Sequence, residues 1–502
     1  MQGRTEGSEG ALSVGDWLLV AAALVLLVPK LLFTFWAFPI ADEAYYWMWG
    51  QHPALSYFDH PPLQAWLQGA SHLVFGRSLF ALRWMSVAAF FGIAWVIFDV
   101  AKRLGGAGWR RLFLKGLVIY LAAPLFGFFG SVVFNDYLLV FLLVVSGYFF
   151  VRFLADVETL GDGRLTHLFA GAVLLGLAGL TKYNAVFLGI AVAGAVLIRP
   201  RLRPLLRRWE LYLAAAIAIG MQAPVLIWAI ETDFASFRFH LSERFEGSFH
   251  GLSVARMRSP VLNTAAYLSP FLVPVIVRFF WARSPVAFER VGKTLAIWVF
   301  WLSSLTFLYI SNYSTVLVWW NIAAFALVIP FASRYMGPWL LTLHVLWGTL
   351  VSIFLAVSFT YLPLTSLVGQ RPFNETDRAF GWAEIATAMR AAEAAHGADF
   401  LAANRYQLAS QLGFALDRGD IETLSRRRDA FDDWLDPEAR RGQDAIILVE
   451  DVDDTESFRA AFETVSKLDE IKIEQFGYPM NTYSLYFGDN FVPPDPFPEA
   501  IR

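Results

Sequence analysis

The chain has 502 residues, of which 57% are hydrophobic and only 17% are charged, and its mean hydropathy is +0.49. A soluble protein of this length would have nearer a quarter of its residues charged, so this composition excludes an ordinary soluble protein. The absence of cysteine excludes disulfides, thiolate nucleophiles and thiolate metal sites. Residues 372–502 hold 13 basic and 26 acidic side chains, whereas residues 1–371 hold 27 and 17. This asymmetry predicts two domains, a transmembrane domain over 1–371 and an acidic domain over 372–502.

Apolar runs of about 18–22 residues predict membrane-spanning helices. The first run lacks a small-residue cleavage site, so we expect it to be a retained helix. The least regular stretch is 166–198, which Thr181-Lys182-Tyr183-Asn184 interrupts. The sequence predicts eleven spans, near residues 17–36, 79–99, 113–132, 136–154, 166–181, 184–198, 211–230, 261–281, 294–311, 315–332 and 338–357.

The basic residues of the connecting loops predict the orientation in the membrane. One set of loops holds 17 Lys and Arg, and the opposite set holds six. The richer set should face the cytoplasm, which puts the loops 37–78 and 232–260 and the C-terminal domain on the outer, periplasmic side. Asp42, Asp136 and Lys182 belong to three different hairpins, and all three then fall at the outer ends of helices.

The first outer loop shows helical periodicity. Apolar residues recur at helical spacing over 62–75, which predicts an amphipathic helix on the membrane surface. Residues 42–50 predict a shorter helix. Beyond 372, helices are expected at 380–395, 406–416 and 455–467, and strands at 399–403, 446–449, 470–476 and 482–487. Alternating strands and helices indicate a small α/β domain.

The most informative motif is Asp42-Glu43-Ala44-Tyr45-Tyr46-Trp47, directly after the first span. Two adjacent carboxylates at the edge of a membrane bundle are costly, which favours a functional site. Asp42 could be a general base that Glu43 assists, and the pair could hold a divalent cation. Equally, acids at a helix start are favoured by the helix dipole alone.

Asp136 and Lys182 are the other ionisable residues at membrane depth on this side. Asp136 could act in the same cavity, or could cap the helix that follows it. Lys182 could hold a phosphate by its charge, or could extend its ammonium to water.

Several further cations lie in or near the outer loops. His60 could donate to a phosphate, as could His240 and Arg244 in the later outer loop, although charges in a loop of that length usually serve solubility. Arg83 lies inside an apolar run, and pairing with an acid such as Asp42 would make it structural. No metal-ligand spacing stands out, and none of the eight histidines forms an i, i+4 pair.

The first motif, followed by Tyr57-Phe58-Asp59-His60-Pro61-Pro62, resembles the first outer loop of family 39-type, polyprenyl-phosphate-dependent GT-C glycosyltransferases. That family includes protein O-mannosyltransferases and the aminoarabinose and galacturonic acid transferases that modify lipopolysaccharide. Supporting similarities extend over nearly the whole chain. They are Asn135-Asp136, Gly179-Leu180-Thr181-Lys182-Tyr183, Ser236-Phe237-Arg238-Phe239, Gly381-Trp382 and Tyr406-Gln407-Leu408-Ala409-Ser410. Ser56 and Asn135 depart from the family pattern, which commonly has Gly and Pro there.

The resemblance implies a multi-pass α-helical GT-C membrane fold and an enzyme of the bacterial inner membrane. The donor would be a polyprenyl-phosphate sugar, and the acceptor a lipid or lipopolysaccharide component. Asp42 would deprotonate the acceptor with Glu43 and Asp136 in the same site. Lys182, His60, Arg244 and His240 would bind the donor phosphate, and Tyr45, Tyr46, Asp59 and Tyr183 would line the cavity.

Three rival functions remain at this point. A protein O-mannosyltransferase would use the same chemistry on a protein acceptor. A transporter or flippase for a lipid-linked sugar should show an inverted repeat or paired half-helices, and the sequence suggests neither. A non-catalytic membrane anchor would leave the outer carboxylates unexplained. No nucleic-acid partner is expected, and the sequence identifies neither the sugar nor the acceptor.

Overall fold

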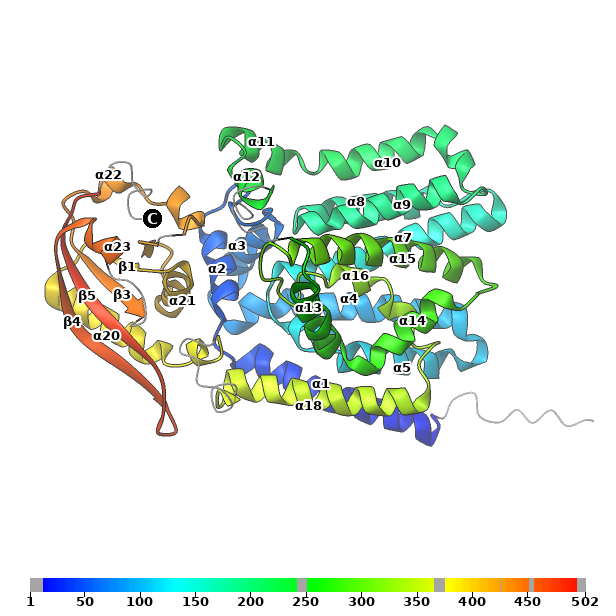
Figure 1. Cartoon of the computed structure of the whole chain (residues 1–502), viewed down its shortest axis with the longest axis horizontal. Helices are drawn as coiled ribbons and strands as arrows, with labels where there is room; N and C mark the ends of the chain where they lie inside the picture. Colours follow the sequence, from blue (N-terminus) through cyan, green and yellow to red (C-terminus); the bar gives the residue numbers. More distant parts are fainter. Residues whose placement is uncertain (1–11, 242–250, 365–374, 426, 451–455, 494–502) are drawn as a thin grey trace, which may run out of the picture.

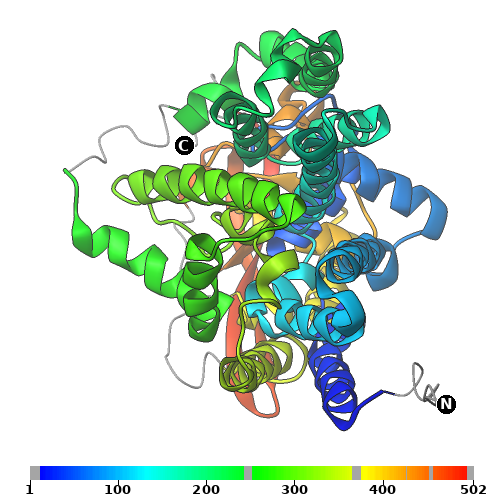
Figure 2. The ribbon, with the colours of Figure 1, turned by 90° about the vertical axis from the view of Figure 1, so that its right-hand side faces the viewer.

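The computed structural model describes residues 12–241, 251–364, 375–425, 427–450 and 456–493. Long helices lie side by side in one bundle, and a five-stranded sheet with its helices covers one end of that bundle (Figure 1). We call the end beside the sheet the sheet-proximal end and the other the sheet-distal end. Viewed from the sheet-distal end, most helices of the bundle are seen end-on (Figure 2).

Several helical segments in the described part of the chain are apolar and long enough to cross a membrane. Five segments are each long and apolar enough to cross a membrane. They are α1 (Val14–Trp36), Leu79–Ala122, which comprises α4 (Leu79–Gly105) and α5 (Trp109–Ala122), α7 (Asn135–Leu160), α15 (Ala287–Ile310) and α18 (Pro338–Thr360). In two further cases, two helices joined at a bend are long and apolar enough only when they are taken together. These pairs are α10 (Trp209–Gly220) with α11 (Ala223–Glu231), and α13 (Val254–Leu268) with Pro270–Trp281, which includes α14 (Val273–Trp281). The fold is therefore multi-pass and helical, with five to seven spans by this criterion, and the count of eleven stays a prediction.

The burial of these helices explains their sequences. In the most apolar 18-residue stretch of each helix, 83% of the residues are buried in α7 and 28% in α18. Because α7 is surrounded by other helices, including α8 (Leu165–Gly179), α4 and α15, it is apolar on all sides. By contrast, α1 turns side chains such as Trp17 and Leu24 outward, each 60% exposed. An outward apolar face of this kind suits contact with lipid.

The prediction of one long helix over 315–332 is wrong. The chain there forms turns and two short helices, α16 (Ala323–Ala326) and α17 (Ile329–Ala332). The Asn321 side chain accepts from Ser303 Oγ at 2.7 Å and donates to Ser304 Oγ at 3.1 Å, so it is anchored on α15. Pro330 supplies no amide hydrogen to a helix continuing from the preceding turn. The predicted run 113–132 also ends early, because α5 stops at Ala122 and α6 (Pro124–Gly127) begins with a proline.

The two helices predicted for the first outer loop are present. They are α2 (Ala41–Gln51) and α3 (Leu63–Phe75), and they lie at the sheet-proximal end (Figure 1). A Cβ atom on Gly50 would lie 2.6 Å from the backbone nitrogen of Gly69, and one on Gly69 would lie 2.7 Å from the Gly50 carbonyl oxygen. The two helices therefore cross with their backbones in direct contact.

The remaining helices of the bundle are short or connect longer ones. They are α9 (Val186–Ile198) and α12 (Ala235–Leu241), with single 3₁₀ turns such as Gly106–Gly108 and Tyr183–Ala185.

The C-terminal region has the α/β character that its sequence suggests. The strands are β1 (Phe400–Ala403), β2 (Glu422–Thr423), β3 (Ala445–Glu450), β4 (Phe462–Gln475) and β5 (Tyr478–Phe491), in the order β2-β1-β3-β5-β4. β1 runs parallel to β2 and β3, whereas β5 is antiparallel to β3 and β4. The helices are α20 (Trp382–His396), α21 (Tyr406–Leu416), α22 (Pro437–Arg440) and α23 (Glu456–Arg459). The predicted boundary at 372 lies outside the described residues.

The helix predicted over 455–467 is wrong. Only α23 is helical there, and β4 begins at Phe462. Residues 462–475 pair with β5 along nearly their whole length. Cross-strand pairing of this kind depends on a partner elsewhere in the chain, so local helical spacing does not reveal it.

The C-terminal region is attached to the first outer loop by polar and aromatic contacts. Gln411 Nε2 donates to the Pro39 carbonyl at 2.9 Å, and Arg77 donates to the Phe414 carbonyl at 2.8 Å. The ring of Phe38 stacks on Trp382, with 5.5 Å between centroids. The ring of Phe414 on α21 also packs against Trp47 of α2, with 5.4 Å between centroids, so α21 lies directly on α2.

Candidate active site

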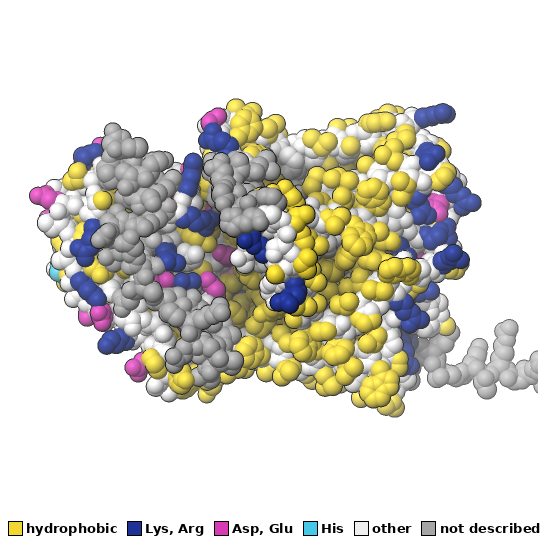
Figure 3. All heavy atoms as spheres, in the orientation of Figure 1, with side chains coloured by type: hydrophobic (Ala, Val, Ile, Leu, Met, Phe, Trp, Pro, Cys, Tyr) yellow, Lys and Arg dark blue, Asp and Glu magenta, His cyan; other side chains and the backbone are white. Residues whose placement is uncertain are grey.

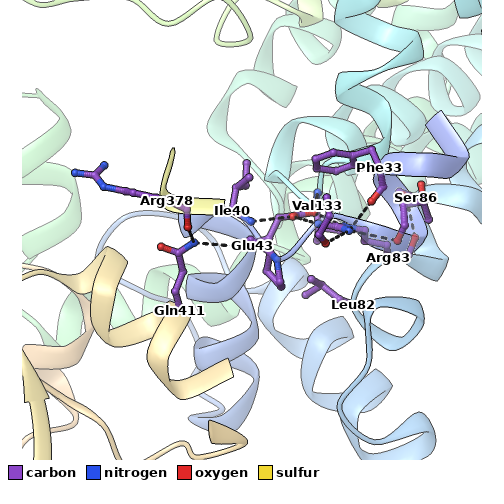
Figure 4. Close-up of polar contacts among 12 residues, drawn as sticks. Phe33, Ile40, Glu43, Leu82, Arg83, Ser86, Val133, Arg378 and Gln411 are labelled. Carbon is purple, nitrogen blue, oxygen red and sulfur yellow. Dashed lines mark hydrogen bonds and ion pairs between the residues drawn. The ribbon is translucent and has the colours of Figure 1, made fainter. Parts of the chain in front are cut away.

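The start of α2 is fixed by a buried ion pair. Glu43 receives Arg83 Nε at 2.9 Å and Nη2 at 2.5 Å, and both side chains are 0% exposed. Glu43 also accepts from the backbone amides of Ile40 at 3.2 Å and Val133 at 2.8 Å (Figure 4). Arg83 donates its other hydrogens to carbonyls at the end of α1, including that of Phe33 at 2.8 Å.

This arrangement assigns Glu43 a positioning role. Its carboxylate joins α2, α4 and the segment that enters α7 through Val133. The partner of Arg83 is thus Glu43 and not the neighbouring Asp42. Because both oxygens of Glu43 already accept hydrogen bonds, this side chain does not converge with Asp42 on a shared cation. No cluster of three or more His, Asp or Glu suited to a metal occurs among the residues that the structure describes.

Asp136 and Lys182 form a second ion pair at the same end of the bundle. Lys182 Nζ lies 2.7 Å from Asp136 Oδ1 and 2.9 Å from Oδ2, and both residues are buried. Asp136 lies in the first turn of α7, where the helix dipole favours a negative charge. Lys182 follows α8, in the turn that separates it from α9. An ammonium has three hydrogens, so this lysine retains capacity for a further acceptor.

Asp42 lies on the first turn of α2 and is partly buried. Its carboxylate makes no hydrogen bond or ion pair with any residue that the structure describes. Burial and the Glu375 carboxylate raise the pKa of Asp42 to about 7, with smaller contributions from Asp59 and Asp136, against the opposing charge of Arg427. A carboxylate with this pKa is a competent proton acceptor near neutral pH.

Asp59 links α2 to the C-terminal region. It accepts a hydrogen bond from Tyr45 Oη at 3.0 Å and forms an ion pair with Arg427. Tyr45 Oη in turn accepts from the backbone amide of Ala430 at 2.8 Å. The Arg427 guanidinium also lies over the ring of Tyr406, 4.9 Å from its centroid.

Aromatic rings surround these charges. The centroid of Tyr45 lies 4.6 Å from that of Tyr406, and His60 lies 6.4 Å from both Tyr46 and Trp49. Burial raises the pKa of Tyr45 and Tyr46 well above the usual value, so both hydroxyls remain protonated. The negative charge of Asp42 also acts on the hydroxyls of Tyr46 and Tyr406.

The segment at Lys182 also contacts other predicted elements. The Leu63 amide donates to the Leu180 carbonyl at 2.9 Å, which ties the start of α3 to this turn. The ring of Tyr183 lies 5.4 Å from that of Phe237 on α12. Arg244 and the side chain of His240 lie outside the described residues.

Several residues around the site are not among those that the sequence predicts. Arg427, Glu375 and Tyr406 come from the C-terminal region, and Arg427 stands within three successive arginines of an otherwise acidic segment. This basic run in an acidic segment indicates a local role for its positive charge. Lys30 is a second residue that the sequence marks, because it is an ionisable residue inside the first apolar run. It is buried and donates to Ser131 Oγ at 2.8 Å, just before α7 begins.

The chain is similar in sequence to known glycosyltransferases. The family model described as dolichyl-phosphate-mannose-protein mannosyltransferase matches residues 59–228. Over 221 residues, the chain is 27% identical to the lipid A galacturonosyltransferase RgtD of Rhizobium johnstonii, which covers 43% of both chains. It is 30% identical over 221 residues to the lipopolysaccharide core galacturonosyltransferase RgtB of the same organism, covering 44% of this chain and 43% of that relative. The matches thus span less than half the length of these curated relatives.

Solved structures extend the similarity over the whole fold. ArnT from Cupriavidus metallidurans superposes with a TM-score of 0.57 in its apo state and 0.59 when bound to undecaprenyl phosphate. Both alignments cover 94% of this chain and 98% of that chain at 15% identity. Together the comparisons confirm the resemblance to family 39-type GT-C glycosyltransferases.

Proposed function

We propose that this protein is a membrane glycosyltransferase that moves a sugar from a polyprenyl-phosphate donor to an acceptor hydroxyl, with Asp42 as the general base. The observation that carries the proposal is the state of Asp42. It is a partly buried carboxylate without a hydrogen-bond partner among the described residues, and its pKa of about 7 suits proton transfer. The glycosyltransferase character of the relatives, and the solved GT-C neighbour with undecaprenyl phosphate, support the same reaction class.

The proposed reaction is a displacement at the anomeric carbon. The acceptor oxygen attacks this carbon and gives its proton to Asp42. The bond between the anomeric carbon and the phosphate oxygen breaks, and its electron pair leaves with the polyprenyl phosphate. The sugar is transferred with inversion, and the protonated Asp42 later loses its proton to solvent.

Lys182 is proposed to bind the donor phosphate. Asp136 holds its ammonium on two hydrogen bonds and leaves the third hydrogen for a phosphate oxygen. Charge that develops on the leaving phosphate would be stabilised by a cation already fixed in place. We include His60 in this subsite because it lies beside Tyr46 and Trp49, whereas the roles of His240 and Arg244 rest on the sequence alone.

The acceptor is proposed to be a lipid or lipopolysaccharide component, because the two curated relatives act on lipid A and on the lipopolysaccharide core. The loop charges favour a site on the periplasmic side of a bacterial inner membrane, with residues 1–371 as the catalytic membrane domain and 372–502 outside. The matching family model carries the description of a protein mannosyltransferase. A protein acceptor is therefore the second candidate.

The experiment is a comparison of envelope lipids by mass spectrometry in a deletion strain. The strain would carry the wild-type gene, Asp42→Asn, or Asp162→Asn as a control, because the side chain of Asp162 is exposed at 73% and lies in a loop away from the site. We expect one sugar-modified lipid with the wild type and the control, and its loss with Asp42→Asn. A sugar lost from a secreted protein instead would favour the protein acceptor. Unchanged lipids and proteins in the deletion strain would refute the proposal.

A further inference from the structure

A second charged site lies at the sheet-distal end of the bundle, away from the candidate active site. Basic side chains gather at this end, while apolar side chains cover the middle of the bundle (Figure 3). Between α4, α5 and the chain after α17 is a pocket of about 330 Å³. It is lined by Leu104, Gly105, Gly108, Arg111, Leu112, Lys115, Ser333 and Arg334.

Among the residues that the structure describes, three cations and no carboxylate line this pocket. Arg111 and Lys115 stand one turn apart on α5, and Arg334 faces them from the chain after α17. Lys115 Nζ donates to the Met336 carbonyl, which fixes its position. Arg111 makes no hydrogen bond or ion pair with any described residue.

Two acids act on these cations in the described part of the chain, and Asp16 accepts hydrogen bonds through Oδ2 only. Glu289 accepts from Arg334 at 2.6 Å and also from Tyr335 Oη at 2.5 Å, and its side chain is 1% exposed. Asp16, on α1, accepts from Ser13 at its own helix start and acts on Arg111 only by charge. The pocket therefore keeps a positive field.

Such a cluster is costly unless an anion shares it. Like charges four residues apart on a helix repel one another. Basic side chains at a membrane surface can also extend to lipid headgroups without forming a site. That alternative would explain scattered cations on a convex surface. It does not explain cations that converge on a pocket between helices.

We infer that this pocket binds the phosphate of an anionic phospholipid headgroup. The shared chemistry is a phosphate ester whose oxygens accept from a guanidinium and an ammonium. A lipid is favoured over a soluble phosphate compound by the surroundings. Leu104 and Leu112 form part of the lining, and Trp339, at the start of the neighbouring α18, is 79% exposed. Tryptophan at this level is typical of a membrane interface.

The test is lipid titration of the purified full-length protein by native mass spectrometry. Wild type, R111Q/K115Q and the control R201Q/R207Q would each be titrated with cardiolipin, phosphatidylglycerol and phosphatidylcholine, with soluble glycerophosphate as a competitor. Arg201 and Arg207 are exposed in the loop after α9 and lie outside the pocket. The control therefore removes two charges from the same end of the protein.

We expect the wild type to retain one anionic phospholipid. R111Q/K115Q should weaken this binding roughly tenfold or more, and R201Q/R207Q less than about twofold. If R111Q/K115Q does not fold, R111Q alone and the charge-preserving R111K/K115R serve instead. The first should weaken binding, and the second should retain it. Equal retention by R111Q/K115Q and its control would overturn the inference, and so would glycerophosphate competing as well as the lipid.

Discussion

The two ends of the bundle neutralise their charges in opposite ways. At the sheet-proximal end, two cations are held by buried acids, Arg83 by Glu43 and Lys182 by Asp136. One carboxylate, that of Asp42, is left over without a partner among the described residues. The local surplus there is negative.

At the sheet-distal end the surplus is positive. The Glu158 carboxylate, 5% exposed, receives Arg199 at 2.6 Å and Arg290 at 2.8 Å. Arg334 is paired to Glu289, and Arg111 has no such partner in the described part of the chain. At both ends buried ion pairs join neighbouring elements, and at each end a charged group, Asp42 or Arg111, has no such pair among the described residues. In the proposals above, these two groups act together with cations that are held in pairs, Lys182 at one end and Arg334 at the other.

Asp42→Asn should have the largest effect on activity. An amide cannot accept the acceptor proton, so the transfer rate of the purified protein should fall roughly 100- to 10,000-fold. Donor binding should persist, because the proposed phosphate ligand is Lys182. The measurement is product formation with a polyprenyl-phosphate sugar, with Asp162→Asn as the control. A rate within a few-fold of the wild type would remove Asp42 from the mechanism.

Glu43→Gln should instead reduce stability. It leaves the fully buried Arg83 guanidinium uncompensated, at a cost of about 3–5 kcal/mol. Thermal unfolding in detergent measures this effect, and the exposed ion pair of Glu438 offers Glu438→Gln as a control with little change. The double variant Glu43→Gln/Arg83→Met should recover part of the loss. Normal unfolding of Glu43→Gln would contradict the positioning role.

Lys182→Met should affect both stability and donor use, because it leaves Asp136 buried without a cation. The double variant Asp136→Asn/Lys182→Met separates the two effects. We expect the unfolding temperature of the double variant to return toward that of the wild type. The donor concentration that gives half-maximal rate or half-maximal binding should stay roughly 10- to 100-fold higher. A donor titration that recovers together with stability would make this ion pair purely structural.

The pH dependence follows from the pKa of Asp42. In the proposed mechanism the deprotonated carboxylate is the active form. With burial raising the pKa of Asp42 to about 7, the rate should level off above pH 7. Below pH 7 it should fall, by about tenfold for each further pH unit. An initial-rate series with saturating donor measures this profile. A profile that stays flat down to pH 5 would show that a group with an ordinary carboxyl pKa limits the reaction.

Arg427→Gln should give the smallest effect. Its side chain is 42% exposed, so the loss of its ion pair with Asp59 should cost less than about 1 kcal/mol of stability. The same substitution removes a positive charge that opposes the raised pKa of Asp42. The acidic limb of the rate profile should therefore move to higher pH, and Arg427→Lys should keep it in place.

The helices of the first outer loop and α21 are predictable because their periodicity is local. The sequence predicts 62–75 and 406–416, and the structure has Leu63–Phe75 and Tyr406–Leu416. The sequence also predicts the second half of β4, as a strand over 470–476, but it places a helix over the first half, where pairing with β5 determines the conformation. The three successive arginines 426–428 mark a basic site in an acidic segment, but the contact that Arg427 makes is not local. Nothing near residue 427 in the sequence indicates that it contacts Asp59.

Loop charge indicates that Asp42, Asp136 and Lys182 belong to one end of the bundle, and the structure places Asp136 in contact with Lys182. The sequence does not show that Asp42 and Glu43 have different environments. Two adjacent carboxylates can be distinguished only when the donors that bind each of them are known. Only the buried Arg83 and the Val133 amide distinguish them.

The glycine crossing of α2 and α3 limits how the sequence of this protein can change. A Cβ atom at Gly69 would lie 2.7 Å from the Gly50 carbonyl oxygen, so even alanine at either position would clash with the backbone of the other helix. The helices would then separate, and Asp42 at the start of α2 would shift relative to Asp59 in the connection between the two helices. Changes in acceptor preference are therefore expected to accumulate in loops and in the C-terminal region, while this crossing point tolerates none.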